Sequence, residues 1–134
     1  RVGFTIAKQL SEQGHSITVI DPSSEDIQKI DDALDVKAIV GKGTYPSILE
    51  KANAAETDMI IAVTRNDEIN MLICQIAFSI FKIPKKIAIG ENTFPFTALR
   101  YSDGLNRLTF LNCRAKCAES TIPTSAATSV ILKL

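Results

Sequence analysis

The sequence predicts an α/β fold, a doubly wound parallel sheet that lacks its first strand. Short runs rich in β-branched residues alternate with helical segments through residue 90, which is typical of parallel sheets built from right-handed crossovers. The run "DMIIAVT" at 58–64 is almost wholly apolar, as in strands that are covered on both faces. The opening "RVGFTIAKQL" already has helical spacing. We therefore expect helices on both faces of an incomplete sheet.

The elements of the first half carry recognisable start and stop signals. A helix at 1–13 is followed by Gly14, a typical residue for ending a helix. "HSITVID" at 15–21 is rich in β-branched residues and is predicted as a strand. "PSSEDIQKIDDAL" at 22–34 has serines at the cap and acids in the first turn, which favours a helix. "VKAIVG" at 36–41 is the next expected strand.

The second half of the alternation is equally regular. "YPSILEKANA" at 45–54 is predicted as a short helix, since proline is tolerated in a first turn. After the strand at 58–64, residues 66–82 form the longest expected helix, and "KKIAIG" at 85–90 is a further strand. The main apolar stripe of that long helix follows the i, i+3, i+4 rule and comprises Ile69, Leu72, Ile73, Ile76, Ala77, Ile80 and Phe81.

Composition limits the function classes. The 134 residues are 46% hydrophobic and 22% charged, which predicts a globular core, and no apolar run is long enough to span a membrane. Fifteen basic residues balance fifteen acidic ones, which argues against a nucleic-acid partner. The three cysteines form no C-x-x-C pair, so we expect reduced thiols, with Cys74 in the core. His15 is the only histidine, which excludes a histidine-rich metal site; we expect it in a solvated turn.

Two residues fit the end of a dinucleotide-binding fingerprint. Open parallel sheets bind ligands beyond the carboxyl ends of their strands, where G-x-G-x-x-G leads into a helix. Gly3 stands where the third glycine of that motif would be, and Asp21 ends the next strand, where an acid can accept hydrogen bonds from a ribose. Taken alone, Gly3 equally fits a helix-packing contact, and Asp21 equally fits a cap of the following helix.

The segment "VGKGTYPSILEKANAAETDMIIAVTRNDEINMLICQIA" carries a more specific pattern. It resembles the nucleotide-binding domain of Trk-type potassium-uptake regulatory subunits, the RCK or TrkA-N family, and the resemblance covers about residues 1–89. The "V-T-x-x-D-E-x-N-M" run is its most specific part, because it joins a buried strand end to a polar helix start. The matching residues are Gly41, Gly43, Thr44, Leu49, Asp58, Val63, Thr64, Asp67, Glu68, Asn70 and Met71.

The resemblance implies a Rossmann-like fold and a set of cofactor-binding residues. Backbone N–H groups of Arg1, Val2 and Gly3, at the start of the first helix, are expected to face a phosphate. Asp21 is expected to hold the adenosine ribose, which favours NAD(H), ATP or ADP over NADP. In the family, the pair Thr64–Arg65 contacts the nucleotide, although Arg65 equally fits a solvated loop charge. We expect no catalytic and no metal-binding residues.

The function that the resemblance implies is regulation of potassium uptake. The expected protein is a non-enzymatic, cytoplasmic module, peripheral at the inner face of the cell membrane, that gates a membrane potassium transporter through ligand-dependent conformational change. Met71, Cys74 and Phe78 lie off the main stripe of the long helix, so we expect an interface there and a homo-oligomer. The alternative is the cofactor-binding domain of an NAD-dependent oxidoreductase. Such an enzyme needs a proton donor or base and a substrate domain, and this sequence has one histidine and little length for a second domain.

The chain departs from the family in two places. Ile89 stands where the family commonly has an arginine near the end of a strand. We expect an incomplete Rossmann-like nucleotide-binding domain at 1–90 and a divergent tail at 91–134, in which "TALRYSDGL" is a possible helix and "SVILKL" a possible strand. Without a first strand, the two neighbouring strands would lose ladder partners, and we expect a poorly stable or self-associating chain.

Overall fold

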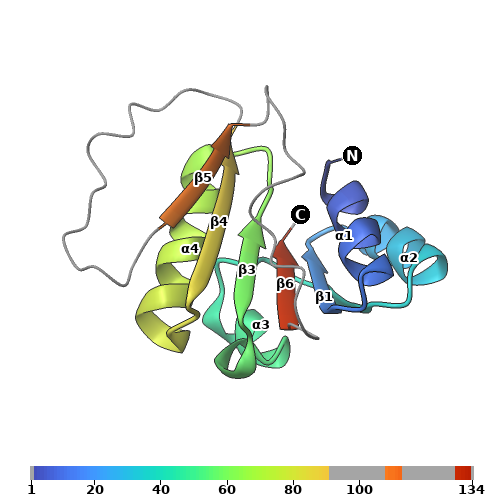
Figure 1. Ribbon diagram of the computed structural model, residues 1–134, viewed down its shortest axis with the longest axis horizontal. Helices are drawn as coiled ribbons and strands as arrows, with labels where there is room; N and C mark the ends of the chain where they lie inside the picture. Colours follow the sequence, from blue (N-terminus) through green and yellow to red (C-terminus); the bar gives the residue numbers. More distant parts are fainter. Residues whose placement is uncertain (1, 91–107, 113–128, 134) are drawn as a thin grey trace.

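The computed structural model describes residues 2–90, 108–112 and 129–133, which form one sheet flanked by helices (Figure 1). The sheet has six strands in the order β2-β1-β6-β3-β4-β5. In chain order the elements are α1 (Val2–Glu12), β1 (Ser16–Asp21), α2 (Ser24–Ala33), β2 (Lys37–Val40), α3 (Pro46–Lys51), the 3₁₀ helix η1 (Ala54–Glu56), β3 (Met59–Ala62), α4 (Asp67–Phe81), β4 (Lys85–Gly90), β5 (Leu108–Asn112) and β6 (Ser129–Lys133).

Every neighbouring pair of strands is parallel, and helices cover both faces of the sheet. On one face, α1 and α2 pack on β1, β3 and β4 through a cluster that includes Leu10, Ile30 and Ile61. On the other face, α3, η1 and α4 pack on the same three strands through a second cluster that includes Leu49 and Ile73. This arrangement confirms the predicted doubly wound α/β fold, and β3 is buried along its whole length as its apolar sequence indicates.

Local signals explain where the helices begin and end. Gly14, at a φ of 82°, reverses the chain after α1, and its missing side chain makes this left-handed conformation accessible. The N–H of His15 then donates to the Leu10 carbonyl. His15 is buried, so the expectation of a solvated turn residue is wrong: the tight reversal places it directly at the start of the sheet. The side chain of Ser23 caps α2, and that of Asn66 caps α4.

The centre of the sheet is the main difference from the expected structure. The strand β6 lies between β1 and β3 and pairs with both, from Ser16↔Ser129 on one side and from Met59↔Val130 on the other. The expected gap at this position is therefore filled, and the expectation that β1 and β3 lose their ladder partners is wrong for this structure. The predicted strand at the end of the chain is confirmed as β6.

The segment beyond residue 90 also contributes β5, which pairs with β4 at one edge of the sheet. Both described parts of the tail thus belong to the same sheet as residues 1–90. The helix expected at 97–105 lies outside the described residues.

The exposed face of α4 is not the expected one. Cys74 is only 1% exposed and lies in the core, whereas Ile80 is 55% exposed and Leu72 is 45% exposed. The ring of Phe78 lies under two ammonium groups, 5.2 Å from Lys82 Nζ and 4.9 Å from Lys86 Nζ. The apolar surface that α4 presents to solvent is therefore centred on Leu72 and Ile80 and not on Cys74. None of the helices in the described ranges is long and apolar enough to cross a membrane.

Candidate functional site

The candidate site lies at the carboxyl edge of the sheet. Because all paired strands are parallel, the residues that follow β1, β2, β3 and β4 gather along this one edge. The chain leaves β1 toward β2 on one side of β6 and leaves β3 toward β4 on the other side. Open α/β sheets bind their ligands at such a reversal in strand order, beyond the carboxyl ends of the central strands.

The start of α1 lies at the same edge. A short turn links the end of α1 to the amino end of β1, so α1 runs against the strands and its first turn comes to the carboxyl edge. Gly3 is buried in that first turn, and no acidic residue stands there to compete with a bound anion. The first N–H groups of a helix have no partner within the helix and can donate to a phosphate. Arg1 lies outside the described residues, and for Val2 only the backbone is described.

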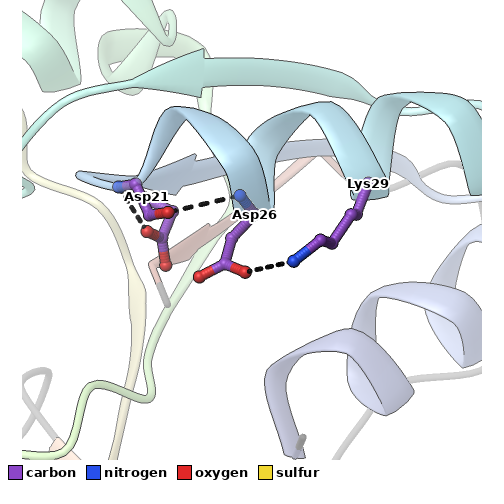
Figure 2. A network of polar contacts seen from close by, with 4 residues as sticks. Asp21, Asp26 and Lys29 are labelled. Atoms are coloured by element: carbon purple, nitrogen blue, oxygen red, sulfur yellow. Dashed lines mark hydrogen bonds and ion pairs between the residues drawn. The ribbon is translucent and has the colours of Figure 1, made fainter.

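Asp21 ends β1 and is 7% exposed. Its Oδ1 accepts a hydrogen bond from the Ser23 N–H at 2.7 Å, which shapes the turn into α2. Figure 2 shows the continuation, in which the Asp26 N–H donates to the Ser23 hydroxyl oxygen and the Asp26 carboxylate meets Lys29 Nζ at 3.7 Å. The bond to Ser23 uses one of the two carboxylate oxygens, so Asp21 keeps acceptor capacity at the strand end while it orders the turn.

The loop after β2 is tied to this strand end. The Gly41 N–H donates to the backbone carbonyl of Asp21 at 2.9 Å. A Cβ at Gly41 would lie 2.8 Å from Ile48 Cδ1, so the absence of a side chain lets the loop pack closely on α3. Beyond it, the ammonium group of Lys42 lies 5.9 Å from the centre of the exposed Tyr45 ring. The missing side chain of Gly41 thus serves the packing of this loop.

Asn70 holds together the part of the carboxyl edge where β3 and β4 end. This residue of α4 is 0% exposed. Its Oδ1 accepts from the Thr64 N–H at 2.9 Å and from the Thr64 hydroxyl at 2.6 Å. Its Nδ2 donates to the Thr64 carbonyl at 3.0 Å and to the Ile89 carbonyl at 2.6 Å. The amide group thus joins the end of β3, the start of α4 and the end of β4, with all of its hydrogen-bonding groups engaged.

The two site residues predicted after β3 differ in their surroundings. The Thr64 hydroxyl is directed to Asn70 and lies 3.1 Å from the Asn66 carbonyl, so it is part of the internal network. Arg65 follows directly and is exposed.

The family pattern included Asn70, but no role was predicted for it from the sequence. A signal existed, because Asn70 lies three and seven residues before Ile73 and Ala77, on the buried face of α4.

Two buried ionisable groups on or beside α4, Cys74 and Lys86, have structural surroundings. Burial raises the pKa of the Cys74 thiol to about 12, against a smaller opposing effect of the Lys86 charge. Burial likewise lowers the pKa of Lys86, whose Nζ donates to the carbonyls of Ile83 and Pro84. A thiol with such a raised pKa is a poor nucleophile, in agreement with the prediction that Cys74 belongs to the core. Within the described ranges, no three His, Cys, Asp or Glu residues are grouped as metal ligands would be.

Comparison with known proteins shows the family of this chain. The family model of the TrkA-N domain matches residues 1–94, which extend from α1 through β4. The chain belongs to the TrkA-N domain family. The predicted resemblance is therefore confirmed. The TrkA-N match does not include β5 or β6, so the strand at the centre of the sheet comes from outside the matched region.

Curated relatives of this TrkA-N domain are potassium-uptake proteins by name. The Trk system potassium uptake protein TrkA of Azorhizobium caulinodans is 42% identical over 88 residues, and that of Halomonas elongata is 40% identical over 88 residues. Each match covers 66% of this chain and 19% of the relative. The TrkA homolog of Methanothermobacter thermautotrophicus is 40% identical over 92 residues, which cover 69% of this chain and 42% of the relative. The chain thus spans only part of the length of these relatives.

Proposed function

We propose that this TrkA-N domain is a regulatory module of a potassium-uptake system that binds NAD(H) or the adenine nucleotides ATP and ADP. The names of the TrkA relatives support the potassium-uptake setting. The observation that carries the ligand proposal is Asp21, a buried carboxylate at the end of β1 whose hydrogen bond to Ser23 leaves acceptor capacity. The second oxygen can accept from a ribose hydroxyl, and a 2′-phosphate at the same place would be repelled.

The other residues of the edge fit the phosphates of such a ligand. The N–H groups of the first turn of α1, including those of Val2 and Gly3, can donate to a phosphate oxygen, with Arg1 beside them in sequence. Arg65 follows β3, which lies on the other side of β6 from β1. Its side chain is exposed and can pair with a phosphate through its planar guanidinium group. Since the hydroxyl, the N–H and the carbonyl of Thr64 are all engaged with Asn70, we assign Thr64 the role of carrying Arg65 and not a direct hydrogen bond to the ligand.

The ligand is bound and not converted in this proposal. Asp21 and Asn70 order turns, and the Thr64 hydroxyl lies within the Asn70 network, so each polar group of the edge has a binding or holding role. Binding acts as a signal when one of two conformations of an assembly binds the nucleotide more tightly, because the ligand then shifts the population toward that conformation. The module would in this way gate a membrane potassium transporter from a peripheral position at the inner face of the membrane.

Self-association is part of the same proposal. The exposed apolar side chains Leu72 and Ile80 lie on α4, eight residues apart and therefore on one side of the helix. Contact between two such surfaces would remove both from water. We therefore propose a homo-oligomer, with α4 in the interface, as the form that docks on the transporter.

Calorimetric titration of the full-length protein with NADH, ADP and NADPH tests the ligand proposal. The expected order is tighter binding of NADH and ADP than of NADPH, and Asp21→Ala should weaken ADP binding by about 1.5–3 kcal/mol, the contribution of a charged hydrogen bond. Asp31→Ala, at an exposed carboxylate of α2, is the matched control and should leave binding unchanged. Equal or tighter binding of NADPH would exclude the ribose role of Asp21. Turnover of NADH with a panel of carbonyl substrates would instead favour an oxidoreductase.

A further inference from the structure

We propose that Asn70 is a positioning residue for the nucleotide site: it fixes the peptide that joins Thr64 to Arg65 and thereby sets the direction from which the Arg65 guanidinium meets a phosphate. This inference rests on the proposed function, since it concerns how that site holds one of its phosphate-binding residues. It assigns a role to a side chain that touches no ligand itself.

Asn70 holds Thr64 on both sides of its backbone, and these contacts are called the clamp. Asn70 accepts from the Thr64 N–H and donates to the Thr64 carbonyl, at 2.9 Å and 3.0 Å. These two groups belong to the two peptide planes that flank Thr64, and the second plane is the one that leads to Arg65. With both planes held by one buried side chain, the backbone of Thr64 has one accessible orientation, and the starting point of the Arg65 side chain is fixed.

The clamp lies just beyond the end of the ladder between β3 and β4. The parallel ladder between β3 and β4 extends to the pair Ala62↔Ala88 and does not continue to Thr64. Asn70 forms the next link, because its Nδ2 donates at once to the Thr64 carbonyl and to the Ile89 carbonyl. A side chain of α4 thus takes over the connection beyond the last pair of the ladder, and it ties the Thr64–Arg65 turn to the end of β4.

The amide of Asn70 lies in apolar surroundings. Asn70 shares the buried face of α4 with Ile73, Cys74 and Ala77. Burying an amide among such residues carries a desolvation cost that an apolar side chain would avoid. A fully satisfied buried polar group gives in return a specific geometry, which non-directional apolar packing does not give. The geometry that Asn70 imposes is that of the turn before Arg65.

A double-mutant cycle on the full-length protein tests this role. Asn70→Asp keeps the size and the acceptor oxygen but removes both donations from Nδ2. We expect it to weaken ADP binding about tenfold in the wild-type background and less than about twofold in the Arg65→Ala background, because a positioning residue has nothing left to position there. Asn66→Asp is the control for the added charge. It places the same charge at the exposed N-cap of α4, four residues before Asn70, and keeps the cap, so it should show no coupling to Arg65→Ala.

Two further measurements keep the test decisive. Thr64→Val removes the hydrogen bonds of the Thr64 hydroxyl to Asn70 and to the Asn66 backbone without adding charge, and it should weaken ADP binding in the same Arg65-dependent way. Amide hydrogen exchange without ligand should show faster exchange at 64–66 and 88–90 in Asn70→Asp, with β1 and α2 unchanged. Equal weakening in both backgrounds, or exchange that rises throughout the sheet, would overturn the inference. Failure of the wild-type protein to bind any of the nucleotides would refute the proposed function and the link to Arg65, and the exchange data would then decide the local holding role separately.

Discussion

Asp21 and Asn70 are two buried polar residues at the same edge of one sheet, yet their hydrogen bonds differ in reach. Asp21 bonds through one oxygen to Ser23, two residues away, so its contact is local. Asn70 engages both ends of its amide and joins three elements, with a partner as distant in sequence as Ile89. Burial alone therefore does not mark a ligand-binding residue. The acceptor capacity that remains after the internal contacts is the better guide, and by that measure we propose Asp21 for ligand contact, whereas Asn70 holds the structure.

The largest effect is expected from a change that removes the common support of both residues. The strand β6 lies between β1, which carries Asp21, and β3, which leads to the Asn70 clamp. Ile131→Pro removes a ladder donor from this central strand, where proline is not tolerated, and should abolish the cooperative urea transition. Ile131→Val should retain the transition within about 1 kcal/mol. A wild-type midpoint and slope for the proline variant would show that the two sides do not depend on β6.

The next largest effect is expected at Asn70. Asn70→Ala leaves the Thr64 N–H, the Thr64 carbonyl and the Ile89 carbonyl without their buried partner. Unsatisfied buried groups cost about 1–3 kcal/mol each, and partial relaxation lowers the sum, so we expect a loss of roughly 2–4 kcal/mol in the free energy of unfolding. Gln75→Ala, on the exposed side of the same helix, should change it by less than about 0.5 kcal/mol. Urea denaturation followed by circular dichroism measures both; similar values for the two variants would contradict the comparison.

Asp21 should show the opposite balance of stability and binding. Asp21→Asn keeps an oxygen that can accept from the Ser23 N–H, so the free energy of unfolding should fall by no more than about 1 kcal/mol. Its nucleotide affinity should fall clearly, because the amide has lost the charge and offers a donor where the carboxylate offered a second acceptor. Denaturation and titration on the same preparation measure the two quantities. A large stability loss with unchanged affinity would reverse the assignment of the two residues.

The smallest signal is expected from Cys74, which lies one helical turn beyond Asn70 on the buried face of α4. In a background with Cys113→Ser and Cys117→Ser, native Cys74 should resist iodoacetamide at pH 8, because burial raises the pKa of its thiol to about 12. Asn70→Ala should accelerate alkylation as the clamp opens, whereas Asp21→Asn should not. Mass spectrometry follows the reaction. Equal rates in all three proteins would mean that the clamp does not control access to this part of α4.

Local patterns predicted the order of the elements α1 to β4, without the 3₁₀ helix η1, and placed Asp21 at a strand end, because capping residues, glycine and β-branched runs act over a few residues. They did not predict that β6 pairs with β1 and β3, since a short apolar run can pair anywhere in a sheet. They also assigned the wrong exposed face to α4. Apolar residues occupy most positions of α4, so its period defines no single stripe, and packing on β3 and β4 decides that Cys74 is buried and Ile80 is not.

The place of β6 in the sheet also dictates the order in which the chain can fold during synthesis. Both neighbours of β6 leave the ribosome before it, and the pair Ser16↔Ser129 joins residues from nearly opposite ends of the sequence. Without β6, the described pairs β1 with β2 and β3 with β4 form two separate half-sheets, each with an open edge. Contacts of such high sequence separation make folding slow. Among the described strands, insertion of β6 therefore closes the open edges of β1 and β3 at once.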